Sequence, residues 1–372
     1  MPATTEADDR RHMGRALALA RRGLGQVWPN PAVGCVLVKD GAIVGRGWTQ
    51  KGGRPHAETE ALKRAGAAAR GATAYVTLEP CSHYGQTPPC AEALIAVGVA
   101  RAVVAIEDPD SRVNGQGNEM LKAAGIAVSV GLRKAEADEM NAGFFLRVRE
   151  ARPLVTLKLA TSLDGRIATK SGESRWITGE SSRRRAHLMR ASHDAILVGS
   201  NTVAVDDPEL TCRLPGMVAR SPVRVVFDAT AKLTAAAKLV TTARQIPTWV
   251  VIGPNAPAAQ RRALEDAGVV LIESKVTDAG HTDVPEALRS LAARGITRVL
   301  CEGGGGIAAS LLRAKLVDRL AWFHAPRVIG GDGIAAADAL GFSTLAAAPG
   351  FRRVAVEASG EDVLETYERT AA

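Results

Sequence analysis

Two short stretches of the chain carry side chains that bind metals and move protons. His56 and Glu58 stand two residues apart in "PHAETEAL", and Cys81 and Cys90 lie at the two ends of "CSHYGQTPPC". One imidazole and two thiolates supply three zinc ligands, which leaves a fourth tetrahedral position open for water, as in catalytic zinc sites. Zinc lowers the pKa of such a water to about 7, and a nearby carboxylate can carry the proton that is released. The pattern therefore predicts a hydrolytic zinc site with Glu58 as the proton carrier.

The residues around the stretches indicate how the four side chains converge. Side chains two positions apart in a helix point in nearly opposite directions, so His56 and Glu58 meet at one metal only beyond the N-terminal end of a helix. Pro55 predicts a helix that starts at His56, and Pro88-Pro89 predicts one that opens at Cys90. The partial positive charge of a helix N-terminus favours a thiolate there.

Two other interpretations of these residues stay open. Cys81 and Cys90 could be buried thiols or part of a structural site. His83, which lies in the same loop, could be the fourth ligand of a closed zinc site, since structural zinc prefers four protein ligands. The second interpretation leaves Glu58 without a role, and we therefore favour the open, catalytic site.

The elements that must position these residues alternate between helices and strands. Apolar spacing predicts a helix over 11–23, and two β-rich runs around Asp40-Gly41 predict a hairpin over 32–48. Strands are expected over 73–78, 101–108 and 126–131, and helices over 56–66, 90–98 and 118–125. This order predicts an α/β/α sandwich that occupies residues 1 to about 145.

A second α/β domain is expected after a seam over 144–155, where charges and Pro153 interrupt the apolar pattern. We place the domains at residues 1–148 and 149–372. Strands recur in the second domain with helical segments between them, and a predominantly parallel sheet is expected. The strands are expected over 154–160, 195–199, 223–228, 248–253, 268–273, 297–304 and 320–326.

Three polar loops follow three strands of this second domain. They are "TSLDGRIATKSGESRWITG", "SNTVAVDDPELTCRLPG" and the glycine run Gly303–Gly306. The carboxyl ends of parallel strands meet at one edge of a sheet, which is the usual ligand crevice. Glycines and a following helix N-terminus suit a phosphate, although such a run is as often a simple tight turn. The standard dinucleotide-binding pattern of a Rossmann fold is absent.

Composition limits the classes of partner. The net charge of +8 favours anionic partners, which include phosphorylated metabolites and nucleic acids. The densest basic run, Arg183–Arg185, is too short for a nucleic-acid arm, and aromatic residues make up only 4% of the chain. Five cysteines without a pairing pattern, no apolar leader and no membrane-length apolar stretch favour the cytoplasm.

A resemblance to known deaminases narrows the expected reaction of the zinc site. A His-x-Glu pair with a downstream cysteine pair resembles the zinc nucleobase deaminases, although eight residues separate the cysteines here and two do in that signature. The segments "NPAVGCVLVKDG", "PHAETEAL" and "VTLEPCSHYGQTPPC" resemble the deaminase half of the bifunctional riboflavin-biosynthesis deaminase–reductase family. The resemblance implies that His56, Cys81 and Cys90 bind zinc, that Glu58 shuttles protons and that Asn30 contacts the substrate pyrimidine. Family members often carry Lys or Arg where this chain has Gln86.

The resemblance continues through the second domain. "KLATSLDGRIA", "SGESRWIT", "VGSNTVAVDDPELTCR" and "EGGGGIAASLL" resemble the reductase half, which has a dihydrofolate-reductase-like fold and uses NADPH. The implied cofactor contacts are Ala160, Trp176, Thr202, Asp206, Gly304, Gly305, Gly306, Ile307, Ala308, Ala309 and Ser310. The implied substrate contacts are Ser174, Arg190, Leu210, Arg213 and Glu302. The polar candidates for proton transfer are Lys158, Asp206 and Glu302.

We therefore expect a two-step enzyme with Zn²⁺ and NADPH as cofactors. The resemblance implies deamination of 2,5-diamino-6-ribosylamino-4(3H)-pyrimidinone 5′-phosphate, followed by reduction of its ribosyl group to ribityl. Phosphorylated pyrimidines are the expected small-molecule partners, with neither nucleic acid nor membrane, in a homo-oligomer. The alternatives are a nucleic-acid deaminase, which the basic charge favours, and a non-enzymatic binding protein with structural zinc.

Overall fold

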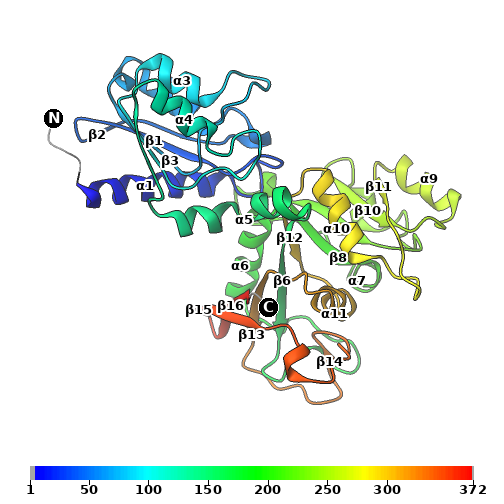
Figure 1. Cartoon of the computed structure of the whole chain (residues 1–372). Helices are drawn as coiled ribbons and strands as arrows, with labels where there is room; N and C mark the ends of the chain where they lie inside the picture. The colour runs from blue at the N-terminus through cyan, green and yellow to red at the C-terminus, as the bar shows by residue number, and fades with distance from the viewer. Residues whose placement is uncertain (1–4, 371–372) are drawn as a thin grey trace. The chain divides into compact units, whose positions relative to one another are not determined.

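Residues 5–370 are described by a computed structural model, and residues 1–4 and 371–372 of the two expected domains lie outside the described residues. The chain forms two compact units, Met1–Ala151 and Arg152–Ala372 (Figure 1). The break lies just after the expected boundary at residue 148. The expected seam begins inside a helix, α5 (Lys134–Glu150), and the chain leaves that helix only at Ala151.

The first unit is a five-stranded sheet with helices on both faces. Its strand order is β2-β1-β3-β4-β5, in which β2, β1 and β3 are antiparallel neighbours and β3, β4 and β5 are parallel. The helices α1 and α5 pack together, and α2, α3 and α4 form a second group (Figure 1). The strands are β1 (Gly34–Lys39), β2 (Ala42–Trp48), β3 (Thr73–Val76), β4 (Arg101–Val104) and β5 (Ala127–Val130), and the other helices are α1 (Glu6–Ala20), α2 (Ala57–Ala65), α3 (Cys90–Val97) and α4 (Gln116–Ala123).

Glycines in the first two strands allow the helices to lie very close to the sheet. A Cβ atom on Gly34 would lie 1.9 Å from the carbonyl oxygen of Ala16 in α1. A Cβ atom on Gly47 would lie 2.0 Å from the carbonyl oxygen of Ala57, the first residue of α2. Because Gly47 pairs with Cys35, next to Gly34 in β1, the two glycines face opposite sides of the sheet. The helices α1 and α2 therefore cover opposite faces.

The second unit contains a nine-stranded sheet in the order β11-β10-β9-β8-β12-β6-β13-β16-β15. All neighbours from β11 to β13 are parallel, as the sequence predicts. The parallel strands are β6 (Leu154–Thr161), β8 (Ala195–Gly199), β9 (Val223–Phe227), β10 (Thr248–Ile252), β11 (Val270–Glu273), β12 (Arg298–Cys301) and β13 (Arg319–His324). The helices of this unit are α6 (Glu180–Ala191), α7 (Ser200–Asp206), α8 (Lys238–Thr241), α9 (Ala258–Asp266), α10 (Val284–Ala293) and α11 (Gly305–Arg313).

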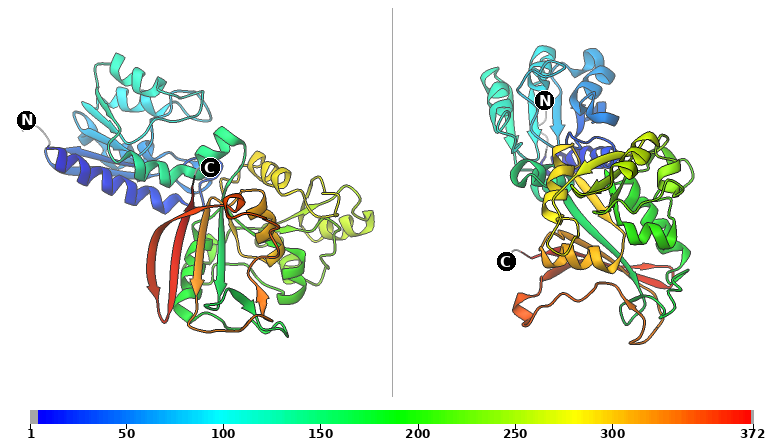
Figure 2. Two further views of the ribbon diagram at one scale, coloured as in Figure 1. Left: turned by 60° about the horizontal axis from the view of Figure 1, so that its bottom comes forward. Right: turned by 90° about the vertical axis from the view of Figure 1, so that its right-hand side faces the viewer.

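Two long antiparallel strands at the end of the chain were not expected from the sequence. β15 (Phe351–Ser359) and β16 (Asp362–Arg369) form a hairpin that adds to β13 and makes one edge of the sheet, shown in red in Figure 2. Gly360, with φ of +73°, supplies the left-handed turn between them. A small separate ladder joins β7 (Arg166–Ala168) to β14 (Ile334–Ala335). Within residues 5–370, no helix combines the length and apolar character needed to cross a membrane.

The close approach of α2 to the sheet yields a test of the first unit. Replacing Gly47 with Val should push α2 away from β2, because the new side chain would overlap the backbone of Ala57. Overpacking of this kind costs about 1–3 kcal/mol of stability. We expect the full-length variant to unfold earlier in urea and to bind zinc at least about tenfold more weakly, because His56 precedes Ala57 directly.

Ala42→Val is the matched control, since Ala42 is an exposed residue of the same strand. Zinc affinity is measured by competition with a chromophoric chelator. If Gly47→Val binds zinc as tightly as the control, the spacing between α2 and the sheet does not set the ligand geometry.

Candidate active sites

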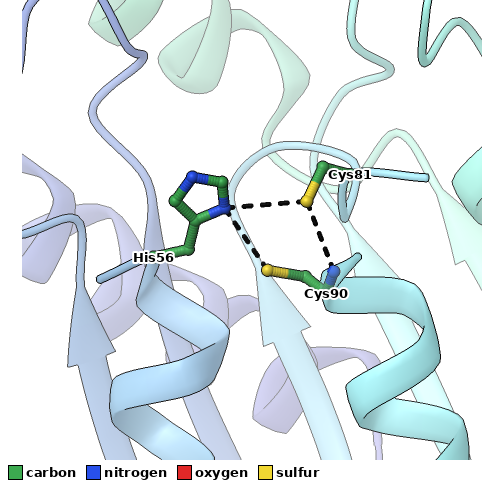
Figure 3. Close-up of side chains that lie close together, drawn as sticks. All are labelled: His56, Cys81 and Cys90. Atoms are coloured by element: carbon green, nitrogen blue, oxygen red, sulfur yellow. Dashed lines mark hydrogen bonds between the residues drawn. The ribbon is translucent and has the colours of Figure 1, made fainter. Parts of the chain in front are cut away.

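His56, Cys81 and Cys90 meet at one point of the first unit (Figure 3). Their ligand atoms all lie within 4.8 Å of one another. His56 Nδ1 is 3.6 Å from Cys81 Sγ and 3.4 Å from Cys90 Sγ. Within residues 5–370 this is the only group of three or more His, Cys, Asp or Glu side chains with metal-binding spacing.

The two helix starts expected from the sequence bring these ligands together. His56 is the N-cap residue of α2, and Cys90 is the first residue of α3, with Pro89 as its N-cap. Cys81 lies in the loop after β3, and the backbone N–H of Cys90 donates a hydrogen bond to its Sγ at 3.3 Å. The N-terminal ends of two helices therefore point at the cluster, as the proline positions predict.

The donor set and its spacing fit a zinc ion. Tetrahedral bonds of about 2.0–2.1 Å to nitrogen and about 2.3 Å to sulfur place the two atom types roughly 3.6 Å apart. The observed separations of 3.6 and 3.4 Å from the imidazole nitrogen match that value. His83 is not a member of this group, so the three-ligand arrangement with an open position fits better than a closed structural site.

The surroundings of the two cysteines shift the pKa values of their thiols. A hydrogen bond from the Cys90 side chain lowers the pKa of Cys81 to about 4, and His56 and the backbone N–H of Cys90 act in the same direction. The hydrogen bond with Cys81, together with burial, raises the pKa of Cys90. A divalent cation would favour the thiolate form of both cysteines.

Glu58 lies in the first turn of α2, beside the cluster, with 3% of its surface exposed. Burial raises the pKa of Glu58 to about 7, despite the opposing effect of His56. A carboxyl group whose pKa lies near neutrality can both accept and return a proton at working pH. This is the property that the proton-carrier role requires.

Two further side chains, which the sequence interpretation missed, hold the loops around the cluster. The carboxylate of Glu79, just before Pro80-Cys81, accepts hydrogen bonds from the backbone N–H groups of Asp108, Gly115 and Asn118 at 3.2, 2.9 and 3.2 Å. It therefore ties the Cys81 loop to the loop before α4. No local pattern in the sequence indicates these partners, since they follow the next strand.

Asn30 is half-buried, and its Nδ2 donates a hydrogen bond to the carbonyl of Gly53 at 2.8 Å. This leaves its amide oxygen available as an acceptor. Asn141, on α5, holds the same loop: it accepts from the N–H of Ala32 at 2.9 Å and donates to the carbonyl of Ala32 at 3.2 Å. The loop that carries Asn30 is therefore fixed by a buried helix residue that the sequence analysis did not identify.

In the second unit, the three polar loops expected to meet do leave the same edge of the sheet. The strands β8, β12 and β6 are adjacent and mutually parallel. Lys158 in β6 and Glu302 directly after β12 stand at nearly the same level, because Leu157 pairs with Cys301. The polar loops therefore gather at the carboxyl ends of these three strands.

A buried ion pair occupies the centre of this edge. Arg190, on α6, donates to both carboxylate oxygens of Glu302, from Nε at 2.7 Å and from Nη2 at 2.9 Å. Burial by itself raises the pKa of Glu302, but Arg190 and Lys158 outweigh it and hold the pKa at about 2. Burial lowers the pKa of Lys158, despite the opposing effect of Glu302. Glu302 is therefore an anion at working pH, and Lys158 is the easier proton donor.

Two helix N-termini beside this pair fit the phosphates of a dinucleotide. The helix α7 follows β8 directly, and α11 follows β12 after Gly304. The helices are close, because a Cβ atom on Gly304 would lie 3.2 Å from Thr202 Oγ1 in α7. Gly304 has φ of +60°, a conformation that favours glycine. Free backbone N–H groups at both helix starts suit anionic oxygens.

A carboxylate that the sequence analysis did not identify lies at the start of α11. The backbone N–H of Asp338 donates to the carbonyl of Gly305 at 3.1 Å. A Cβ atom on Gly305 would lie 2.6 Å from Asp338 Oδ1. A side chain at Gly305 would therefore collide with Asp338 whether or not a cofactor binds.

The other predicted residues of the second unit lie on the polar loops and on the helices and strands beside them. Arg175 donates to the backbone carbonyl of Asp206 at 3.2 Å, and the guanidinium of Arg183 stacks on the exposed Trp176 ring at 4.7 Å. Arg213 is exposed and pairs with Glu209 at 3.2 Å. Leu210 is buried, Ser174 is half-buried, Ala160 belongs to β6, and Ile307, Ala308, Ala309 and Ser310 form the first turns of α11.

Comparison with known proteins finds a matching family for each of the two units. The cytidine and deoxycytidylate deaminase zinc-binding region matches residues 6–106, and the RibD C-terminal domain matches residues 153–364. The riboflavin biosynthesis protein RibD of Escherichia coli (strain K12) is 43% identical over 366 residues, which cover 95% of this chain and 98% of that protein. This chain belongs to the RibD family. The RibD protein of Aquifex aeolicus is 40% identical and covers 97% of this chain and 98% of its own length.

Solved structures agree over nearly the whole chain. One crystal form of Acinetobacter baumannii RibD matches with a TM-score of 0.88 and 37% identity, and it covers 99% of this chain and 100% of its own. A deaminase/reductase of Thermotoga maritima matches with a TM-score of 0.85 and 34% identity, and it covers 98% of this chain and 99% of its own. The chain is therefore a deaminase and reductase of riboflavin biosynthesis that acts on small molecules and uses zinc and NADPH.

The position of Glu58 yields a direct test of the first site. Glu58→Gln should keep its zinc, because the carboxylate lies beside the three ligands and is not one of them. Deamination should fall about 10²–10⁴-fold, as expected when a general acid–base is lost. Zinc content by elemental analysis and ammonia release are measured on the full chain.

NADPH-dependent reduction of the deaminated compound is the internal control, and it should be unchanged. Loss of zinc from the Glu58→Gln variant would show that Glu58 is a metal ligand, which would overturn its role as the proton carrier.

Proposed function

We propose that the first unit deaminates 2,5-diamino-6-ribosylamino-4(3H)-pyrimidinone 5′-phosphate and that the second reduces the ribosyl group of the product to ribityl. The product would be 5-amino-6-ribitylamino-uracil 5′-phosphate. The observation that carries the proposal is the buried Glu58 carboxyl beside the His56–Cys81–Cys90 cluster. The Thermotoga maritima relative is named a diaminohydroxyphosphoribosylaminopyrimidine deaminase and 5-amino-6-(5-phosphoribosylamino)uracil reductase, which supports these substrates.

In the deaminase unit, His56, Cys81 and Cys90 would hold the zinc ion. When bound, zinc supplies a Lewis acid that makes water a nucleophile near neutral pH. Glu58 takes one proton of the attacking water and delivers it to the ring nitrogen as the C–O bond forms. It then takes the remaining proton of the added hydroxyl and delivers it to the amino group, so that the C–N bond breaks and ammonia departs. Asn30 accepts a hydrogen bond from the pyrimidine through its free amide oxygen. The raised pKa of Glu58 suits both directions of proton transfer.

In the reductase unit, the N-terminal turns of α7 and α11 would hold NADPH, with contacts from Ala160, Trp176, Thr202, Asp206 and the Gly304–Ser310 segment. NADPH supplies the hydride for the sugar carbon. Lys158 supplies the proton to the sugar oxygen, because burial lowers its pKa. Glu302 stays ionised and holds Arg190, which together with Arg213, Ser174 and Leu210 binds the substrate. Asp206, the last residue of α7, contacts the cofactor and is a further candidate for proton transfer.

The functional boundaries are proposed at residues 1–148 for the deaminase and 149–372 for the reductase. We propose free phosphorylated pyrimidines and not nucleic acids as partners, since aromatic residues make up only 4% of the chain. A homo-oligomer in the cytoplasm is proposed as well. The edge strand β15, with Val354 and Val356 about half exposed at 49% and 53%, supports self-association, which light scattering can test.

The test is incubation of the full chain with the diaminopyrimidine ribotide, with and without NADPH, followed by mass analysis. Without NADPH, the mass of the substrate should change by the replacement of one NH group with one oxygen atom, and ammonia should appear. With NADPH, two further hydrogens should be gained. An unchanged mass in both incubations would contradict the proposed substrate.

The assignment of Lys158 predicts the pH dependence of reduction. A proton donor must be protonated, so kcat for reduction should fall as pH rises through the pKa of Lys158, which lies below its ordinary value of about 10.4. Glu302 raises that pKa and Arg190 lowers it, so Glu302→Gln should move the alkaline limb to lower pH. The measurement is the kcat–pH profile of wild type and Glu302→Gln at saturating NADPH.

Lys158→Met is the companion variant. It should lose the alkaline limb of the kcat–pH profile together with most of the reductase activity. If Lys158→Met keeps the same alkaline limb as the wild type, another group supplies the proton.

A further inference from the structure

Arg54 links the two segments that carry the zinc ligands. It stands two residues before His56, and its Nη1 donates a hydrogen bond to Thr87 Oγ1 at 2.7 Å. Thr87 belongs to the loop between Cys81 and Cys90. The same guanidinium also approaches Gly85, where a Cβ atom would lie 3.0 Å from Arg54 Nη2. The half-buried Arg54 side chain therefore crosses from the start of α2 to the cysteine loop.

The charge of Arg54 has no counter-ion. Across residues 5–370, no carboxylate pairs with it, and Thr87 is its only hydrogen-bond partner. The loop over 82–89, "SHYGQTPP", contains no Lys, Arg, Asp or Glu. Arg112, whose backbone carbonyl accepts a hydrogen bond from Ser82 of this loop, differs, because its Nε and Nη2 donate to the two carboxylate oxygens of Asp110. Arg54 therefore contributes an uncompensated positive charge at the rim of the zinc site.

An uncompensated arginine beside a substrate site is suited to a phosphate. A guanidinium presents several N–H donors in a planar fork that matches phosphate oxygens, and only one of them is used by Thr87. The proposed substrate carries a phosphate monoester on the sugar attached to the ring that is deaminated.

We propose that Arg54, held in place by Thr87, binds the 5′-phosphate of the pyrimidine substrate at the rim of the deaminase site. This inference rests on the proposed function and adds to it the residue that makes the deaminase selective for a phosphorylated substrate. Gln86, between the two loop residues that the guanidinium approaches, is neutral and contributes hydrogen bonding but no charge.

The test compares two substrates, the ribotide and the same compound without its phosphate. In wild type, kcat/KM for ammonia release should be about tenfold or more higher for the ribotide, as expected for one charge-assisted phosphate contact. Arg54→Gln should lose most of this preference by lowering kcat/KM for the ribotide alone. The zinc content of the variant should equal that of wild type, because Arg54 is not a ligand.

Three further variants sharpen the test. Lys63→Gln removes one positive charge from an exposed position of the same helix, α2, and should leave the preference unchanged. Thr87→Val should reduce the preference in wild type but not in the Arg54→Gln background, because it acts only through Arg54. Gln86→Lys should restore part of the preference to Arg54→Gln, since it returns a cation to the same loop.

The possible outcomes separate the inference from the proposed function. Equal losses on both substrates in Arg54→Gln would mean that Arg54 supports the loop or the metal, and the phosphate contact would be overturned. Equal efficiency of wild type on both substrates would overturn this inference alone. Failure of wild type to deaminate either compound would overturn the proposed function and this inference with it.

Discussion

The deaminase site depends on one spatial constraint, the convergence of two helix N-termini on the loop after β3. That convergence brings His56 Nδ1 and the sulfurs of Cys81 and Cys90 within 4.8 Å of one another. It requires α2 to lie almost in contact with the sheet, which Gly47 permits. The same placement buries Glu58 in the first turn of α2 and raises its pKa to about 7. Metal binding and proton transfer therefore follow from a single packing arrangement.

In the reductase unit, a parallel sheet brings the residues of the proposed site together. Because β8, β12 and β6 are adjacent and parallel, their polar loops open on the same edge. The buried Arg190–Glu302 pair fixes the centre of that edge, and burial beside it lowers the pKa of Lys158. Removing either partner would leave a buried charge without compensation, which is strongly destabilising. The pair is therefore part of the framework as well as part of the proposed site.

The sequence predicts features that depend on local patterns. The residue types and spacing of His56, Glu58 and the two cysteines indicate a zinc site. The prolines before two of these ligands predict the helix starts that orient them. Contacts between distant segments have no such signal: Asn141 on Ala32, Glu79 on the loop before α4, and Asp338 on Gly305 arise only when the chain has folded. The hairpin of β15 and β16 was missed because neither strand has a continuous apolar run, and β15 is mostly exposed at the edge of the sheet.

The central claim, that one imidazole and two thiolates hold zinc and leave one position open, is tested most directly by X-ray absorption at the zinc edge of the full chain. The account predicts two sulfur ligands at about 2.3 Å and two nitrogen or oxygen ligands at about 2.0–2.1 Å. It also predicts that His83→Ala leaves this spectrum unchanged, because His83 lies outside the cluster. A spectrum with fewer than two sulfurs, or one that loses a light-atom ligand in His83→Ala, would contradict the account.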